Sequence, residues 1–493
     1  MRNWMKISLL LAALCISLAA TAQVDKGMEY FNKFDYVNAI KCFTRAAEQG
    51  DAKAQLKLGL CYYYGTGIAI NRPEAVKWFY KASEQNLADA QYFLGFCYQE
   101  GEGVAQNYNE ASKWYRKAAE QGDVNAQFSL GALYENGQGV DSNPQEAVKW
   151  YRKAAEQGDA EAQLNLGACY DQGKGVTQNH NEAVKWYRKA AEQGNIDAQF
   201  NLGACYYNGQ GVEQNYDKAV KWFREAADQG LAQAQFSLGI CYNQGRGVTQ
   251  NYKEAVKWYQ KAAEQGNIGA QFSLGFCYHE GQGVAQDYYE AVKWFRKTAE
   301  QGLADAQINL GNCYFNGQGV KQNYNEAVNW YRKATEQGCA TAQYGLSICY
   351  YQGLGVAQNY NEAVKWFRKG AEQGLAIAQY NLGVCYHEGQ GVTLDYNEAV
   401  KWVHKAAEQG LANAQFILGG CYYKGQGVAQ DTKEAMKWYS KSAEQGFSEA
   451  QYILGGCYYV GYGVEKNLER AKYWFQKAAD QGNEKAIEAL KDF

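Results

Sequence analysis

The dipeptide Ala-Gln recurs twelve times at intervals of 36 residues, with no insertion or deletion between copies. A fixed period of this length is typical of solenoids built from paired helices, in which each unit buries its apolar side against the next. We number every repeat from the alanine of this dipeptide, which is position 1. The twelve alanines are Ala54, Ala90, Ala126, Ala162, Ala198, Ala234, Ala270, Ala306, Ala342, Ala378, Ala414 and Ala450.

The first helix of each repeat, helix A, is predicted from residues that recur every four positions. Position 5 is leucine and position 9 is tyrosine in all twelve copies, as in Leu58 and Tyr62. A spacing of four places positions 1, 5 and 9 on one helical face, which we expect to be the core stripe. Helix A should run from about three residues before position 1 to position 11. The glycines at positions 12 and 14, as in Gly65 and Gly67, should end it.

The second helix, helix B, begins with a capping pattern. Position 18 is asparagine or aspartate in every copy, and glutamate follows three residues later in ten of the twelve. This variant of the capping box predicts that both side chains accept backbone N–H groups at the helix start. The rest of helix B has a sequence like that of Ala183 to Gly194, and we expect the final glycine to end the helix. We expect the tryptophan at position 25 to pack between hairpins. We expect the basic residues at positions 24, 27 and 28 to pair with the glutamate at position 31.

The repeat resembles a known family. The pattern L-G-x-C-Y-x-x-G-x-G-V followed by E-A-V-K-W-[YF]-x-K-A-A-E-Q-G is similar to the Sel1-like repeat, a relative of the tetratricopeptide repeat, over residues 24–493. The resemblance implies an all-α, right-handed superhelix of αα-hairpins with a concave groove that binds proteins. Residues 51–482 would hold twelve such repeats of 36 residues.

The two ends of the chain differ from the repeats. Residues 1–22 carry two basic residues, an apolar run and the A-x-A pattern of Ala20-Thr21-Ala22, which together predict a cleaved signal peptide. We therefore expect export to the periplasm or beyond, without membrane insertion after cleavage. Residues 23–50 are expected to form a shorter capping hairpin closer to a tetratricopeptide unit. Residues 483–493 are expected to form a C-terminal capping helix.

Eleven of the fourteen cysteines stand at position 8, one in each copy except the third, which has Leu133. Equivalent positions on stacked helices should lie about 10 Å apart. A disulfide requires Cα atoms within about 7 Å. We therefore expect buried free thiols that pack as small apolar residues. Cysteine-rich members of the resembled family carry two cysteines per repeat, whereas here Cys42 with Cys61 is the one pair whose linkage stays open.

The chemistry of the remaining residues argues against several functions. The four histidines form no H-x-x-x-H pattern and there is no Cys-x-x-Cys, so we expect no metal site. No Ser-x-x-Lys motif, nucleophile–base pair or dinucleotide fingerprint is present, so we expect neither catalysis nor a cofactor. The net charge of −3 leaves no basic stripe for nucleic acid. Hydrolysis of β-lactams, which the cysteine-rich relatives imply, is the third hypothesis for function.

The positions that vary between copies indicate a binding surface. Positions 3, 7 and 10 share a stripe of helix A opposite to positions 1, 5 and 9, and position 10 changes in size and charge from copy to copy. We expect this stripe to line the groove, polar and acidic early in the chain and aromatic later. A protein or peptide is the expected partner, and a cell-wall or secreted glycan is the alternative. The candidate binding residues are Tyr207, His279, Phe315, Tyr351, His387, Tyr423 and Tyr459.

Overall fold

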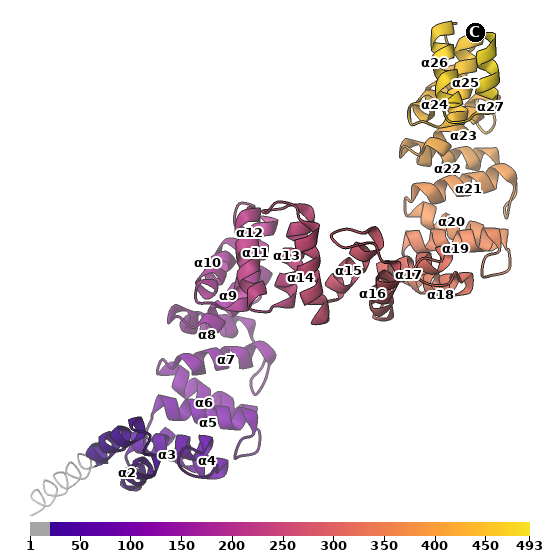
Figure 1. Cartoon of the computed structure of the whole chain (residues 1–493). Helices are drawn as coiled ribbons and strands as arrows, with labels where there is room; N and C mark the ends of the chain where they lie inside the picture. Colours follow the sequence, from indigo (N-terminus) through magenta and orange to yellow (C-terminus); the bar gives the residue numbers. More distant parts are fainter. Residues whose placement is uncertain (1–19) are drawn as a thin grey trace, which may run out of the picture. The chain divides into compact units, whose positions relative to one another are not determined.

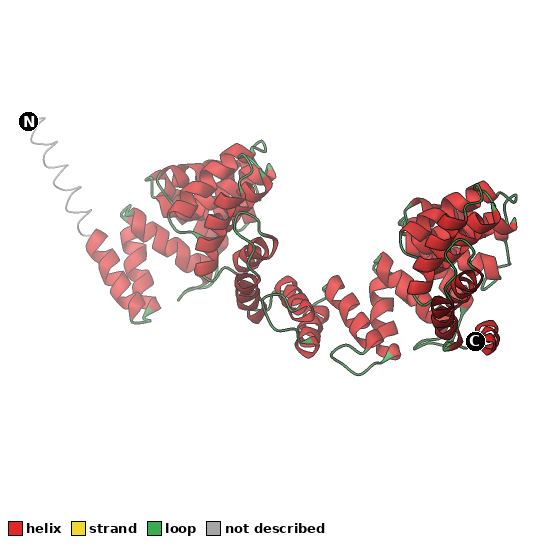
Figure 2. Cartoon of the chain, turned by 90° about the horizontal axis from the view of Figure 1, so that it is seen from above, coloured by secondary structure: helices red, strands yellow, loops and turns green. Residues whose placement is uncertain are grey.

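The computed structural model describes residues 20–493, so the predicted signal peptide lies almost wholly outside the described part. All regular secondary structure over these residues is helical (Figure 2). The chain divides into two compact units, Met1–Asn251 and Tyr252–Phe493, and the division falls in the loop between two helices. No described helix is both long and apolar enough to cross a bilayer.

Unit 1 holds an opening hairpin and the following repeats (Figure 1). A first helix covers residues 20–32. The others are α2 (Tyr36–Glu48), α3 (Ala52–Tyr64), α4 (Arg72–Glu84), α5 (Ala88–Glu100), α6 (Tyr108–Glu120), α7 (Val124–Asn136), α8 (Pro144–Glu156), α9 (Ala160–Gln172), α10 (His180–Glu192), α11 (Ile196–Asn208), α12 (Tyr216–Asp228) and α13 (Ala232–Gln244).

Unit 2 continues the same alternation of helices and ends with a short cap. Its helices are α14 (Tyr252–Glu264), α15 (Ile268–Glu280), α16 (Tyr288–Glu300), α17 (Ala304–Asn316), α18 (Tyr324–Glu336), α19 (Ala340–Gln352), α20 (Tyr360–Glu372), α21 (Ala376–Glu388), α22 (Tyr396–Glu408), α23 (Ala412–Lys424), α24 (Thr432–Glu444), α25 (Ser448–Val460), α26 (Leu468–Ala479), α27 (Glu484–Ala489) and the 3₁₀ turn η1 (Leu490–Asp492). In α27 the side chain of Ala486 is fully buried.

The predicted hairpin is confirmed in both units. Helix α3 begins one residue after the expected start and ends at position 11, where Gly65 adopts a left-handed φ of 74°. Helix α8 begins after Asn143, whose side chain accepts the N–H of Glu146 at 3.1 Å. Gly194, which ends the equivalent of that helix in the next repeat, has a φ of 89°. Residue types that favour caps therefore set both helix ends in each repeat.

The glutamate half of the predicted capping box is wrong. The backbone N–H of Asn143 donates to the carbonyl of Tyr134 at 2.9 Å, so it has no need of a side chain. Glu146 instead forms an ion pair with Lys149, three residues later, at 3.2 Å. The predicted pairing of basic residues with the glutamate at position 31 is also wrong in general. The lysine at position 28 lies over the tryptophan of its own helix instead. The ammonium of Lys153 is 4.3 Å from the ring centroid of Trp150.

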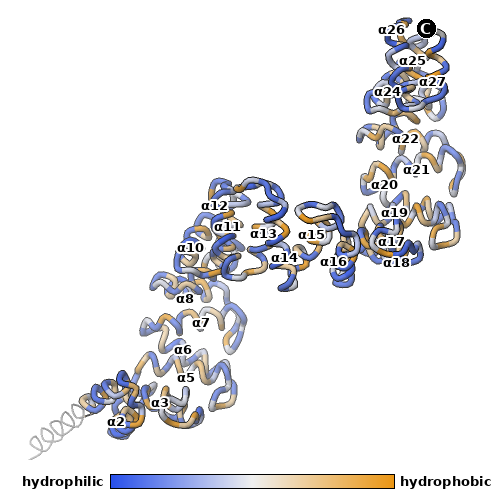
Figure 3. The backbone as a smooth tube through the Cα atoms, viewed as in Figure 1, coloured by the Kyte–Doolittle hydropathy of each residue, from blue (hydrophilic) through white to orange (hydrophobic). Residues whose placement is uncertain are grey.

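The core stripe of helix A differs from the predicted one. Positions 1, 2, 5 and 8 are buried, whereas the tyrosine at position 9 is buried only in Tyr134 and Tyr206. The other tyrosines lie at the edge of the core, where Tyr170, for example, accepts a hydrogen bond of 2.7 Å from Arg152 of the preceding repeat. Apolar residues recur along the helices of both units (Figure 3). The predicted packing role of the tryptophan at position 25 is confirmed in the copies where this residue is buried, as in Trp150, which is 3% exposed.

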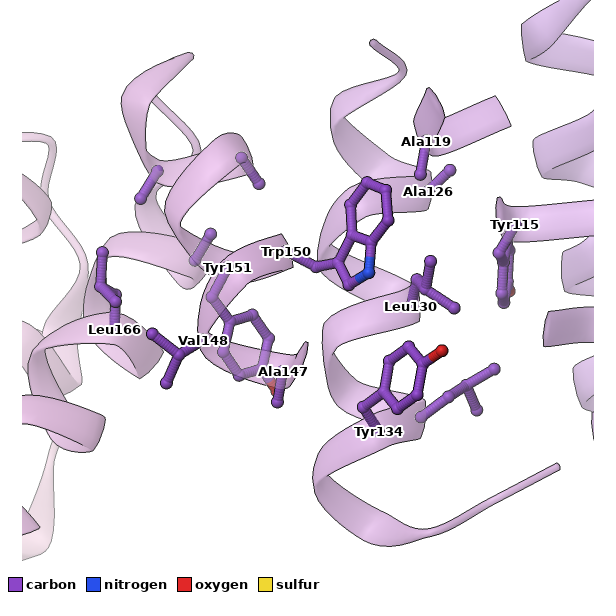
Figure 4. Close-up of a cluster of buried hydrophobic side chains, with 14 of the residues drawn as sticks. Tyr115, Ala119, Ala126, Leu130, Tyr134, Ala147, Val148, Trp150, Tyr151 and Leu166 are labelled. Atoms are coloured by element: carbon purple, nitrogen blue, oxygen red, sulfur yellow. The ribbon is translucent and has the colours of Figure 1, made fainter. Parts of the chain in front are cut away.

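Helix B closes the hairpin through an aromatic ring at position 26 in eleven of the twelve repeats, and Val403 takes this place in the other. Figure 4 shows Tyr151 of α8 close to Ala147 and Val148, in one buried cluster that also includes Leu130 and Tyr134 of α7. The ring lies on the glycine at position 6, because a Cβ on Gly131 would lie 2.7 Å from a ring carbon of Tyr151. Carbon atoms do not approach that closely, so any larger residue would force the two helices apart. The glycine at position 6 therefore determines how closely helix A packs against helix B.

A ladder of buried glutamines joins the repeats, and the sequence pattern did not reveal it. The amide nitrogen of Gln127, at position 2, donates to the carbonyl of Ala119 in the preceding repeat at 3.1 Å. Its amide oxygen accepts from Gln157, at the end of helix B of its own repeat, at 2.8 Å. The same pair recurs 30 residues apart in both units, as in Gln445 and Gln415. A buried amide with both groups paired favours one register of stacking.

The second loop glycine allows two repeats to approach closely. Gly139, at position 14, has a φ of 68°. A Cβ on this residue would lie 2.1 Å from the carbonyl oxygen of Tyr108 in the preceding repeat. Both the left-handed backbone and the missing side chain are needed. The G-x-G motif is a turn, as the sequence predicted, and the structure shows in addition that it contacts the previous hairpin.

The thirteen described cysteines are all unpaired, Cys42 and Cys61 included, and those at position 8 are at most 8% exposed. Burial raises the pKa of Cys61 to about 11 and that of Cys97 to about 12. Since the thiolate is the reactive form, these thiols should be inert in the native protein. Cys339 is the one described cysteine that is half-exposed.

We expect at most one thiol of the native protein to react quickly with a colorimetric disulfide reagent at pH 8. After unfolding in urea without reductant, at least eleven thiols should react, because burial protects the position-8 cysteines and no bridge links them. Counting the thiols released before and after urea tests this. The recovery of five or six disulfides instead would contradict the buried-thiol interpretation.

Candidate functional site

Three positions of helix A form its solvent-facing side. Position 11 is exposed in every copy, and positions 4 and 7 are half-buried in every copy except at Phe276, which is 41% exposed. We call positions 4, 7 and 11 the helix A face. Positions 1, 2, 5 and 8 point into the core, so this face is the surface that helix A offers to another molecule.

The predicted binding residues at position 10 lie beside this face, turned towards the start of helix B. The ring of Tyr351 meets Tyr360, the first residue of α20, edge-on at 5.1 Å between centroids. It also lies 6.2 Å from the position-26 ring of Phe367. Four further predicted residues make the same edge contact at 5.1–5.2 Å, and these pairs are Tyr207 with Tyr216, His279 with Tyr288, Phe315 with Tyr324, and His387 with Tyr396.

The last two predicted residues are more open. Position 19 is Thr432 or Leu468 in their repeats, so neither has the tyrosine that covers the others. Tyr423 is 39% exposed and Tyr459 is 38% exposed. Tyr423 meets Tyr462 of the following loop at 5.4 Å instead. The end of unit 2 therefore exposes two aromatic side chains at position 10.

In several repeats position 10 also contacts position 13 of the next repeat, 39 residues later. Lys174 forms an ion pair of 2.8 Å with Glu135. In the same way Arg246 donates to the hydroxyl of Tyr207 at 2.7 Å. The predicted residues are consequently not gathered in one pocket. They form a row in which five of the seven side chains contact the first residue of their own helix B.

The model of the Sel1 repeat matches the chain thirteen times in tandem, from residues 25–51 to residues 448–483. The chain belongs to the Sel1 repeat family. The first of the thirteen matches falls on the opening hairpin, for which the sequence favoured a tetratricopeptide-like unit. Proteins with these repeats generally bind other proteins, and the scaffold is typically non-catalytic.

Two solved Sel1 structures are similar over most of their length. One is c5321, described as a protective antigen present in uropathogenic Escherichia coli strains, with 39% identity and a TM-score of 0.80. The match covers 92% of this chain and 97% of that one. The other is a Sel1 repeat protein from Oxalobacter formigenes, with 34% identity, a TM-score of 0.52, and coverage of 63% and 93%. No curated protein matched the sequence.

In the early Sel1 repeats the acidic residues at position 10 are paired. Burial raises the pKa of Glu135, but hydrogen bonds from Lys174 and Tyr151 outweigh burial, so the pKa lies below its ordinary value. The carboxylate of Asp171 lies 2.7 Å from the imidazole Nδ1 of His180. Both carboxylates therefore have a partner within the array, and Lys174 neutralises Glu135, so this carboxylate is a poor candidate for attracting a basic partner.

The described Sel1 repeats hold no group of three or more histidine, cysteine or carboxylate side chains that could share a metal ion. His279 and His387 each lie against their own helix B, at 5.1 Å from Tyr288 and 5.2 Å from Tyr396. Each histidine thus has an aromatic neighbour and acts as one more ring in the position-10 row.

The sequence did not point to positions 4 and 11. Position 11 varies between copies as much as position 10 does, from Tyr64 and Glu100 to Lys424 and Val460. Variation together with constant exposure was the signal that could have found it. Helical spacing shows which positions share a side of helix A. Which of these sides helix B covers depends on the contact between the glycine at position 6 and the ring at position 26.

Proposed function

We propose that this Sel1 repeat protein is an exported, non-catalytic scaffold that binds a protein partner along the helix A face. The observation that supports this is the combination of exposure and variation at position 11. The neighbouring core positions barely change between copies, while position 11 changes charge and size and stays exposed throughout. An array of nearly identical hairpins gains an individual binding surface through such positions.

Export is part of the proposal and rests on the signal-like residues 1–22 alone. Fractionation of cells that express the full chain tests it, because the mature protein should be recovered outside the cytoplasm. The partner is best sought there, by cross-linking in the native envelope followed by capture of the chain. Turnover of nitrocefin by the purified protein would favour the β-lactam hydrolase alternative and contradict a purely binding role.

Alanine substitutions on the two sides of the array should separate the binding surface from the rest. Phe276→Ala and Tyr423→Ala should each weaken the captured complex by about 2 kcal/mol, because aromatic anchors dominate interfaces. The controls are Lys365→Ala and Lys369→Ala on helix B, which should change binding by only a few tenths of a kcal/mol. Titration by calorimetry measures each affinity, with circular dichroism to verify folding.

Position-10 residues that pack on helix B, unlike the exposed Tyr423, must be interpreted separately in this scan, because their substitution also affects stability. Tyr351→Ala removes contacts with Tyr360 and Phe367, so it should lower the free energy of unfolding by about 1–2 kcal/mol as well as any affinity. Loss of binding in both lysine variants, with full binding by Phe276→Ala and Tyr423→Ala, would place the interface on helix B and contradict the proposal.

A further inference from the structure

A pocket of about 330 Å³ opens on the helix A face between the last two repeats of unit 2, at α23, α24 and α25. Two glycines at position 7, Gly420 and Gly456, stand where other copies carry larger residues such as Leu60 and Phe96. A Cβ on Gly456 would meet nothing within 4 Å. The missing side chain therefore leaves the hollow open. Its lining residues are Tyr423, Tyr439, Tyr452, Ile453, Gly456, Cys457, Val460 and Tyr462.

Tyr439 contributes a hydroxyl that has no protein partner. The residue is only 5% exposed, and its hydroxyl forms no hydrogen bond within the part of the chain that the structure describes. The oxygen is not sealed, in contrast to the unpaired hydroxyl of Tyr115. A phenol that is buried, unpaired and still reached from the pocket is costly unless a ligand completes its hydrogen bond.

Two other repeats show how the same hydroxyl can be paired. Tyr331, at the same position 26, donates to Asn312 at position 7 of its own repeat at 2.7 Å. Tyr151 donates to Glu135 at position 10, also at 2.7 Å. The repeat of Tyr439 has Gly420 at position 7, and a Cβ there would lie 3.6 Å from the hydroxyl. The glycine thus lacks both the bulk that position 7 carries in most copies and the acceptor that Asn312 supplies to Tyr331.

The start of unit 1 provides a comparison at the same register. A smaller pocket of about 230 Å³ lies there against Phe43, Leu60 and Lys57. Phe43 takes the place of the tyrosine and Leu60 that of the glycine, so the hollow is reduced and its floor has no hydroxyl. The features needed to bind a ligand specifically are therefore combined at the end of unit 2.

The lining restricts the chemistry of the occupant. None of the lining residues carries a charge, and four of them are tyrosines. Tyr423 and Tyr462 form one wall, with centroids 5.4 Å apart and planes at 62°, and both are partly exposed. A sugar would bury several hydroxyls against a site that offers few polar partners, which is unfavourable. An aromatic side chain makes ring contacts with this wall, and a phenol also supplies an acceptor for Tyr439.

We propose that this pocket, defined by Gly456 and the hydroxyl of Tyr439, binds an aromatic side chain of the partner protein, with tyrosine favoured. The proposal rests on the proposed function of partner binding and names one anchor point within it. The phenol ring of the partner lies between Tyr423, Tyr462 and Tyr452, and its oxygen accepts the hydrogen bond from Tyr439.

The experiment uses p-cresol, which carries the phenol of a tyrosine side chain, and the full chain alone. Saturation-transfer difference spectra over a concentration series should show saturable binding of p-cresol. Gly456→Leu should abolish it by filling the hollow, and Tyr439→Phe should weaken it about fivefold through loss of one hydrogen bond. The matched control Ala204→Leu makes a similar change at position 7 of unit 1 and should leave binding unchanged.

Three results would overturn the proposal. They are no saturable binding of p-cresol, equal binding by Gly456→Leu in a folded protein, or equally tight binding of methyl β-glucoside, which would indicate a glycan. Because Tyr439→Phe keeps the ring and its packing, it tests the hydroxyl even if the leucine variant is poorly folded. The chain is tested without a partner, so a failure here leaves the proposed scaffold function to its own affinity measurements.

Discussion

Raising the pH from 9 to 11 should unfold the array cooperatively. The position-8 thiols ordinarily titrate at 9.0, but burial raises the pKa to about 11 in Cys241 and to about 12 in Cys349. The native chain therefore holds protons that the unfolded chain releases in this range. The stabilisation is complete below pH 9 and is lost as pH rises through 11. Burial raises the pKa of the position-26 tyrosines in the same direction, as in Tyr439.

The expected size of the effect is large because the thiols repeat. Each thiol contributes about 1.4 kcal/mol per pH unit while only the unfolded state is ionised. A block of three repeats that unfolds together would lose about 4 kcal/mol per pH unit, which is comparable with the total stability of a small domain over two units. Urea titrations followed by circular dichroism at a series of pH values measure this slope.

The matched control replaces three consecutive thiols, with Cys349→Ala, Cys385→Ala and Cys421→Ala in one variant. Its free energy of unfolding should be lower at pH 7, by about 1 kcal/mol per site, because each alanine leaves a small void. Between pH 9 and 11, however, the variant should lose stability more slowly than the parent. Equal slopes in the two proteins would show that the buried thiols do not control the alkaline transition.

Much of the fold could be predicted because the signals are local. The capping residue Asn143 and the glycines Gly137 and Gly139 act within one turn of the chain, so their types alone place the ends of α7 and α8 within a residue. A period without insertions then extends those boundaries to every copy. Local backbone preferences and hydrogen bonds decide these features, and both can be recognised in the sequence.

The contacts between helices could not be predicted with the same accuracy. Gln127 is a polar residue, and its burial depends on a carbonyl and a glutamine that the folded neighbours supply. Tyr170 was expected in the core but lies at its edge, and the ring of Tyr187 is buried instead because Gly167 admits it. The candidate site shifted for the same reason. Helix B covers the side of most position-10 residues, so position 11 is the exposed row, with the half-buried positions 4 and 7 beside it.

Deleting 36 residues in register, from Ala198 to Gln233, should leave a folded and soluble array. The deletion joins Asp197 to Ala234. Asp197 is therefore again followed by a position-1 alanine, and the start of helix A keeps its sequence pattern. The close contacts of the array join helices that are neighbours in the chain, as between α10 and α11 or α12 and α13. Each hairpin is therefore replaced by an equivalent one, and stability falls only by one repeat and one interface.

Deleting 18 residues, from Ala198 to Asn215, should instead cause aggregation. This change removes most of α11 and its loop but keeps α12, so Phe223 loses Gly203, on which its ring packs. Two B helices would then follow each other, and the apolar sides of α12 and α13 would lack a partner. Size-exclusion chromatography and circular dichroism of both variants compare the outcomes. If the shorter deletion stays monomeric and helical while the 36-residue deletion precipitates, then the hairpin of helix A and helix B is not the unit that folds.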